Sequence, residues 1–92
     1  MEKIIRTESR LTADTALALE KSFKEAIMEK PERLVLDMKD TQYISSACLR
    51  EILKLLKASR ANGVSLTFRN VGPTVLEIFE ITGFASGLNI EN

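Results

Sequence analysis

The order of the periodic segments is the feature that most constrains this fold. Segments with helical spacing alternate along the chain with short runs typical of strands. The helix-like segments are 12–30, 47–61 and 73–82, and the strand-like ones are 3–11, 33–38, 64–68 and 88–90, with a further short extended piece at 43–44. Such alternation predicts an α/β fold, with a mixed or mainly parallel sheet of about four strands and helices packed against it.

Local signals set the expected ends of the helices. Thr12 is expected to cap the first helix, with Thr15 at the capping-box position, and Pro31 to end it. Gly63 is expected to end the second helix and Pro73 to occupy the first position of the third. The residues expected to face the core are Ala16, Leu19, Phe23, Ala26 and Ile27, then Leu49, Ile52, Leu53 and Leu56, then Val75, Leu76 and Phe79.

Composition removes several classes of function. The 92 residues contain no histidine and one cysteine, Cys48, which excludes Ser-His-Asp catalysis, an internal disulfide and multi-cysteine metal sites. Lysine and arginine total 13 and aspartate and glutamate 13, so no basic face for nucleic acid is expected. We therefore expect one domain over residues 1–92, with no cofactor and no metal.

The lengths of the apolar runs indicate in which cellular compartment the protein is expected. None approaches the roughly 18 residues that a membrane-spanning helix needs. The first ten residues, "MEKIIRTESR", contain no apolar signal core and no cleavage site. We therefore expect a cytoplasmic protein without membrane insertion.

The stretch "QYISSACLREIL" (42–53) places two adjacent serines where an extended segment gives way to a helix. Ser46 is expected to cap that helix, which contributes about 1 kcal/mol, and Ser45 to be a turn residue. A phosphoryl group on Ser46 would also be stabilised by the positive end of the helix. A cap and a modification site are therefore both open interpretations.

Three other residues have competing interpretations. Cys48 near the helix start could be a reactive thiol, but with no histidine to act as its base we expect a small buried residue. Asp37 and Asp40 could form a carboxylate pair or accept a phosphoryl group, but without a second acidic cluster we expect them to stabilise a loop or lie at the surface.

Three segments together resemble the STAS domain, and within it the small bacterial anti-sigma-factor antagonists. "RLTADTALALEKSF" resembles the family's entry into its first helix. "RLVLDMKDTQYISSACLREIL" resembles its central strand, loop and helix, where members read D-S-[ST]-G. "ANGVSLTFRNVGPTVLEIFEITGF" resembles its C-terminal strand, loop and helix. The resemblance covers the chain from about Arg10 to its end.

The resemblance implies a phosphorylation site and partners. The serine that the partner kinase phosphorylates in the family aligns with Ser46, with Ser45 as runner-up acceptor, and the surrounding Ser45, Ala47 and Arg50 would contact the partner. The expected partners are an anti-sigma-factor serine kinase and its cognate phosphatase. The protein would bind the kinase when unphosphorylated and release it when phosphorylated, and would not itself be an enzyme.

The chain also departs from the family. Ser45 stands where many members have aspartate, Ala47 where others have serine or threonine, and Cys48 where a glycine usually follows. Members commonly carry one more N-terminal strand, so the N-terminus here looks short. The absence of that extra strand would leave an open sheet edge, at which two copies could form a homodimer.

Two further functions remain open. One is a STAS accessory subunit of a lipid-transport ATP-binding complex, which would share the fold without phosphorylation. The other is a small enzyme, which would need a catalytic set that the residues do not offer, with Cys48 or Asp37 as its only candidates.

Overall fold

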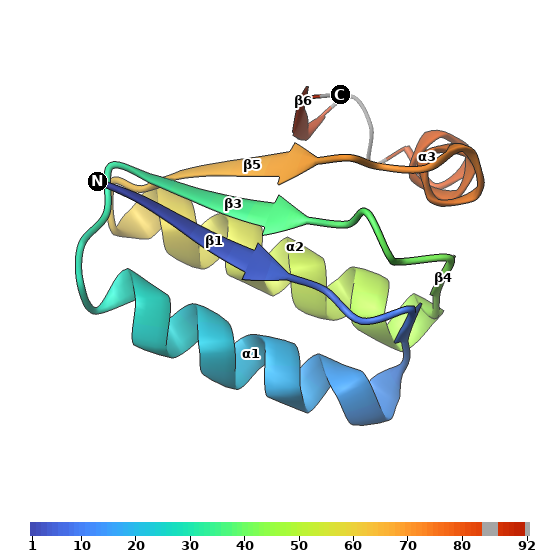
Figure 1. The fold of residues 1–92 in the computed structure, drawn as a ribbon, viewed down its shortest axis with the longest axis horizontal. Coiled ribbons are helices and arrows are strands. Elements are labelled where there is room, and N and C mark those ends of the chain that lie inside the picture. The colour runs from blue at the N-terminus through green and yellow to red at the C-terminus, as the bar shows by residue number, and fades with distance from the viewer. Residues whose placement is uncertain (84–86, 92) are drawn as a thin grey trace.

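The computed structural model describes residues 1–83 and 87–91 (Figure 1). Six strands and three helices alternate along these residues, in the order that the periodicity predicts. They are β1 (Glu2–Arg6), β2 (Arg10–Leu11), α1 (Ala13–Ile27), β3 (Arg33–Asp37), β4 (Tyr43–Ile44), α2 (Ser46–Ala61), β5 (Ser65–Arg69), α3 (Pro73–Ile81) and β6 (Asn89–Glu91).

The main sheet has four parallel strands in the order β1-β3-β5-β6. Helix α1 connects β1 to β3 through the short strand β2, and α2 connects β3 to β5 through β4. Strands β2 and β4 pair in parallel as a separate ribbon. The predicted small α/β fold with a mainly parallel four-stranded sheet is thus confirmed.

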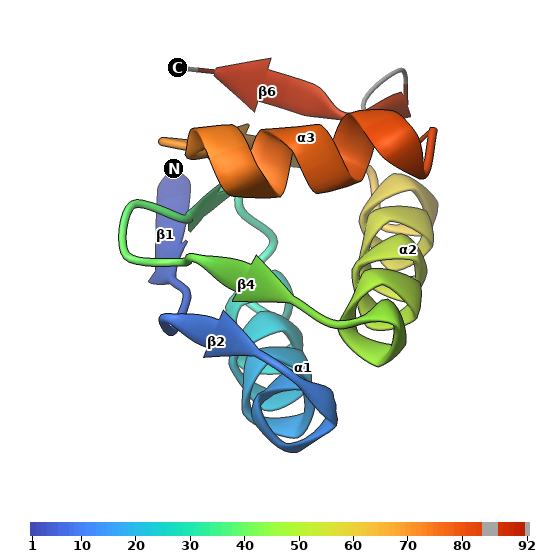
Figure 2. The same ribbon diagram turned by 90° about the vertical axis from the view of Figure 1, so that its right-hand side faces the viewer.

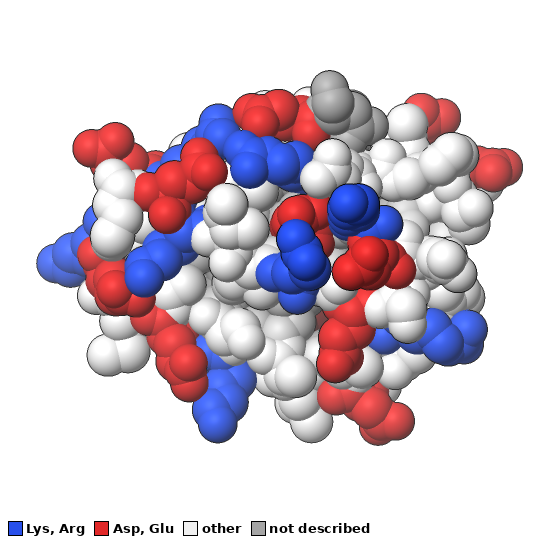
Figure 3. All heavy atoms as spheres, in the orientation of Figure 1, with Lys and Arg blue, Asp and Glu red and all other residues white. Residues whose placement is uncertain are grey.

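The two faces of the sheet differ. Figures 1 and 2 show α1 and α2 on the same side, where they cover Leu34, Leu36, Leu66 and Phe68. The opposite face carries an ion-pair network in which Arg33 contacts Glu2 at 2.8 Å and Glu91 at 3.1 Å. Figure 3 shows this open face, with acidic and basic side chains interspersed.

The starts of α1 and α3 and the end of α2 agree with the sequence signals. The backbone N–H of Thr12 donates to Thr15 Oγ1 at 2.7 Å, which completes the predicted arrangement before α1. Gly63 adopts φ 69° after α2, a conformation that glycine tolerates without strain. Pro73 is the first residue of α3.

Two helix predictions were wrong in detail. Helix α1 ends at Ile27 rather than at Pro31, and Lys30, the residue before the proline, lies outside the helical region with φ 49°. Leu53, predicted to face the core, is 39% exposed, whereas Leu55 is buried at 3%. Helix α2 contacts both α1 and strand β5, and its buried side includes Leu55.

The predicted single strand over 3–11 is also wrong, because it is divided into β1 and β2. Thr7 makes the last contact with β3, since its backbone N–H donates to Asp37 O at 3.0 Å. The buried hydroxyls of Thr7 and Thr41 are hydrogen-bonded, and Thr41 Oγ1 donates to Glu8 O at 2.7 Å. Beyond Thr7 the chain is therefore tied to the loop that follows β3, and β2 pairs with β4 of that segment.

Within the residues that the structure describes, no helix is long and apolar enough to cross a membrane.

Candidate functional site

The paired serines lie at the end of the molecule where the parallel strands terminate. Figure 2 looks onto this end and shows β2, β4, the start of α2 and the side of α3. The backbone N–H of Ser45 donates to Leu11 O at 2.8 Å, which ties the start of α2 to strand β2. The position of both serines is therefore set by pairing between segments far apart in sequence.

Ser45, and not Ser46, caps α2, so the predicted cap was wrong by one residue. Ser45 has extended backbone angles of φ −82° and ψ 163°, and its Oγ accepts a hydrogen bond from the Cys48 N–H at 3.2 Å. Its carbonyl accepts from the Leu49 N–H at 2.9 Å. Because β4 pairing keeps the chain extended through Ser45, the helix can begin only at Ser46.

Ser46 is the first residue of α2, and its side chain is exposed. Among residues 1–83 and 87–91, no group hydrogen-bonds to its hydroxyl. The backbone N–H groups of Ser46 and Ala47 also lack acceptors within this part of the chain, as the first N–H groups of a helix generally do. An anionic group on Ser46 would therefore have nearby donors and the positive end of the helix to stabilise it.

Three exposed residues follow one side of α2. Ser46, Arg50 and Leu53 are spaced at i, i+4 and i+7, so they lie along the same stripe of the helix. Arg50 is exposed, whereas Ala47 is half-buried. The stripe combines a hydroxyl, a cation and an apolar side chain.

The sequence reasoning did not identify Arg10 and Tyr43 as part of this end. The Arg10 guanidinium lies 4.6 Å from the centroid of the Tyr43 ring, and Tyr43 is 40% exposed. A cation over an aromatic face is a favourable contact that holds both side chains in place. The available signal was that Tyr43 is the single tyrosine of the chain and precedes the serines by two residues.

Cys48 is fully buried, as predicted. Burial raises the pKa of its thiol to about 11, with a smaller contribution from the carboxylate of Glu51. The thiol is therefore neutral near pH 7, and the helix start does not make it a nucleophile.

Asp37 stabilises the loops beside the site, which confirms one of its predicted roles. Its Oδ1 accepts from the Lys39 N–H and from the Asn70 side chain, both at 3.1 Å. The Asn70 hydrogen bond is the main cause that lowers the pKa of Asp37, with further contributions from the Lys39 N–H, Arg6 and Arg69. Asp40 is exposed. Across 1–83 and 87–91, no three Cys, Asp or Glu side chains gather closely enough to hold a metal ion.

Comparisons with known proteins place the chain in a family. The STAS domain model matches residues 2–92. BtrV from Bordetella bronchiseptica, which is named as an anti-sigma factor antagonist, is 41% identical over 68 residues. That match covers 73% of this chain and 59% of BtrV, so the chain spans about three fifths of its relative.

Two solved structures share the fold. The sulfate transporter family protein from Wolinella succinogenes superimposes with a TM-score of 0.86 at 17% identity, over 96% of this chain and 71% of that one. The unphosphorylated anti-sigma factor antagonist SpoIIAA superimposes with a TM-score of 0.78 at 16% identity, over 97% and 78%. The resemblance seen in the sequence is thus confirmed along nearly the whole chain, which belongs to the STAS domain family.

Proposed function

We propose that this protein is a phosphorylation-controlled partner switch of the anti-sigma-factor antagonist type. Unphosphorylated, it binds an anti-sigma-type serine kinase; phosphorylated on Ser46, it releases that kinase, and a phosphatase resets it. The observation that carries the proposal is the exposed Ser46 hydroxyl at the first position of α2, without a hydrogen-bond partner in the described part of the chain. The likeness to BtrV supports the same role.

The geometry favours Ser46 over Ser45 as the acceptor. The Ser45 oxygen already accepts the Cys48 N–H and sits in the turn between β4 and α2. Phosphorylating it would disturb the cap, which contributes about 1 kcal/mol. Ser46 has no such structural role, so its modification leaves the cap intact.

The modification would change the surface rather than the fold. The kinase transfers the γ-phosphoryl group of ATP to Ser46 Oγ while the hydroxyl proton leaves, and the serine gains nearly two negative charges. The helix start compensates part of that charge, so α2 stays folded. A partner that covers Arg50 and Leu53 would have to desolvate the phosphate, and the complex would dissociate.

In this role the protein is the substrate and not the catalyst. Its buried, neutral Cys48 thiol and its hydrogen-bonded Asp37 offer no active nucleophile or base. The reaction uses ATP and a soluble kinase, so the cytoplasm is the proposed compartment.

The alternative, an accessory subunit of a lipid-transport complex, is not favoured. BtrV, the curated relative, is named for the antagonist role. The Wolinella structure, whose name refers to transport, is 17% identical to this chain and therefore supports the shared fold alone.

The experiment combines the protein with its cognate anti-sigma serine kinase and ATP. The wild type and Ser45→Ala should each gain one phosphate by intact mass, whereas Ser46→Ala should gain none. In parallel, the kinase should bind the unphosphorylated wild type and Ser46→Ala, but not the phosphorylated wild type.

Two outcomes would contradict the proposal. Phosphate retained in Ser46→Ala and lost in Ser45→Ala would move the acceptor to Ser45. Equal kinase affinity for the phosphorylated and unphosphorylated wild type would show that the modification is not a switch. Lys21→Glu, an exposed charge change on α1 and away from the α2 stripe, is the matched control and should behave as the wild type.

A further inference from the structure

Among residues 1–83 and 87–91, no strand pairs with the outer side of β1, so this edge of the main sheet is open. Strand β1 is outermost in the order β1-β3-β5-β6, and it pairs with β3 along its inner side. The Thr7 N–H donates to Asp37 O, and Met1 O accepts from the Glu32 N–H, so these two residues direct their backbone groups toward β3. Along a strand, successive residues direct their backbone N–H and C=O groups alternately to one side and to the other.

The backbone groups of Glu2, Ile4 and Arg6 therefore point outward from the sheet. Their side chains lie on the open face, because they are in register with Arg33, Val35 and Asp37 rather than with the core leucines. Ile4 is 55% exposed, although it is a β-branched apolar residue at the centre of this edge. An edge of this kind is a template for pairing with another strand.

We propose that β1 pairs with β1 of a second copy of this chain, antiparallel and centred on Ile4. In this register Ile4 lies opposite Ile4 of the second copy, and Glu2 lies opposite its Arg6. All three residues direct both backbone groups outward, so each N–H meets a carbonyl of the other copy. The two sheets then form one continuous sheet.

Charge selects this register over the alternatives. The two-fold axis places Glu2 beside an arginine at both ends of the strand pair, and opposite charges facing each other across strands are stabilising. Glu2 keeps Arg33 at 2.8 Å on its inner side, while Arg6 contacts Asp37 only at 3.9 Å and is free to turn outward. A parallel, in-register pairing would instead place Glu2 opposite Glu2 and Arg6 opposite Arg6.

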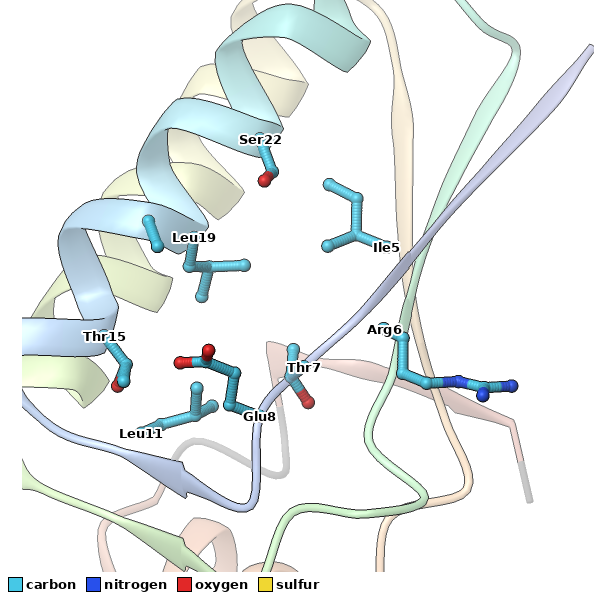
Figure 4. Close-up of a pocket in the computed structure, with 9 residues that line it drawn as sticks. Ile5, Arg6, Thr7, Glu8, Leu11, Thr15, Leu19 and Ser22 are labelled. Carbon is cyan, nitrogen blue, oxygen red and sulfur yellow. The ribbon is translucent and has the colours of Figure 1, made fainter.

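On the helix side, a cavity beside the edge can receive a side chain of the incoming strand. This cavity of about 140 Å³ lies between β1 and α1, next to the edge (Figure 4). Small residues of α1, Ala18 and Ser22, line it together with Ile5 and Glu8. The antiparallel register places Lys3 of the second copy opposite Ile5, beside this cavity and near the Glu8 carboxylate.

One five-residue strand pair is a small interface. The dimer should therefore form reversibly and depend on protein concentration. Because β1 and the Ser46 end of α2 are distinct parts of the fold, the dimer can fail without affecting the proposed switch, and the reverse also holds.

The test uses charge reversal followed by mixing. Sedimentation velocity over a concentration series should show a reversible dimer for the 92-residue wild type. Glu2→Arg creates two arginine–arginine pairs and Arg6→Glu two glutamate–glutamate pairs, so each should weaken the dimer about tenfold or more. An equimolar mixture of the two variants should dimerise again, because every facing pair is then of opposite charge.

Two further variants separate the edge from the fold. Ile4→Pro removes an outward N–H but no hydrogen bond to β3, so it should abolish the dimer while circular dichroism and thermal unfolding report a folded monomer. Lys57→Glu changes charge away from the edge and should dimerise as the wild type does. A monomeric wild type at every concentration, or a mixture no more dimeric than its two components, would overturn the proposal.

Discussion

Ser45 and Ser46 are neighbours in sequence but differ in hydrogen bonding. Ser45 accepts the Cys48 N–H, while Ser46 is exposed at the first position of α2. The sequence alone located the junction of extended chain and helix but placed the cap one residue too late. The deciding contact, between the Ser45 N–H and Leu11 O, joins residues that no local pattern relates.

The two alanine variants should differ in stability. Ser45→Ala removes the cap and should lower the free energy of unfolding by about 1 kcal/mol, whereas Ser46→Ala should change it by less than about 0.5 kcal/mol. Urea denaturation followed by circular dichroism measures both values. Equal losses in the two variants would show that Ser45 is not the cap.

The buried Cys48 thiol should be unreactive in the folded protein. Its pKa of about 11 leaves little thiolate at pH 8, and burial blocks access to the sulfur. A chromogenic disulfide reagent at pH 8 should therefore react slowly with the native protein and rapidly after denaturation in guanidinium. Rapid reaction of the native protein would contradict the buried, neutral thiol.

At the scale of elements, Asp37 joins two loops at the carboxyl ends of β3 and β5. Its carboxylate accepts from Lys39 in one loop and from Asn70 in the other, which helps to position the chain before β4. The sequence predicted a loop-stabilising role for Asp37. It could not predict the pairing with Asn70, which is 33 residues away.

The lowered pKa of Asp37 gives a pH dependence of defined sign. Because the pKa is lower in the folded protein, the charged carboxylate stabilises the fold at neutral pH, and this contribution is lost as the pH falls below about 4. Asp37→Asn should cost about 1 kcal/mol at pH 7, since it loses the charge-assisted part of its hydrogen bonds. Urea unfolding should show that the difference in free energy of unfolding between Asp37→Asn and wild type is smaller at pH 3 than at pH 7. An equal difference at the two pH values would contradict the stabilising role of the Asp37 carboxylate.

The division of β1 from β2 shows where local pattern is insufficient. Residues 3–11 read as one strand, but Thr7 and Thr41 are hydrogen-bonded across 34 positions and redirect the chain between the two strands. The resulting β2–β4 ribbon brings Arg10 onto Tyr43. A contact of that sequence separation is decided by tertiary structure, so the periodicity of either segment does not contain it.

Over the whole molecule, the sequence predicted the element order, the parallel sheet and most of the core. These follow from apolar periodicity, which directly reflects burial. It did not predict the exposure of Leu53, because the stripe that α2 buries depends on how α2 packs against α1 and the sheet.

Exposed Leu53 provides a test of the partner surface. Leu53→Glu places a charge one turn beyond Arg50, on the stripe that the kinase would cover, and should weaken kinase binding about tenfold or more. The free energy of unfolding should change little, because the side chain is 39% exposed. Isothermal titration with the kinase measures the affinity, and wild-type affinity in this variant would exclude the stripe from the interface.

The central claim is that one phosphoryl group on Ser46 controls partner binding. Its most direct test is intact-mass spectrometry of the protein isolated from its host, followed by fragmentation of the peptide over residues 40–50, which contains both serines. We expect two populations, one unmodified and one with a single phosphate on Ser46, and only the unmodified one should co-purify with the kinase. A phosphate located on Ser45 would contradict this expectation. So would a protein that is never phosphorylated although the kinase still alternates between its bound and free states.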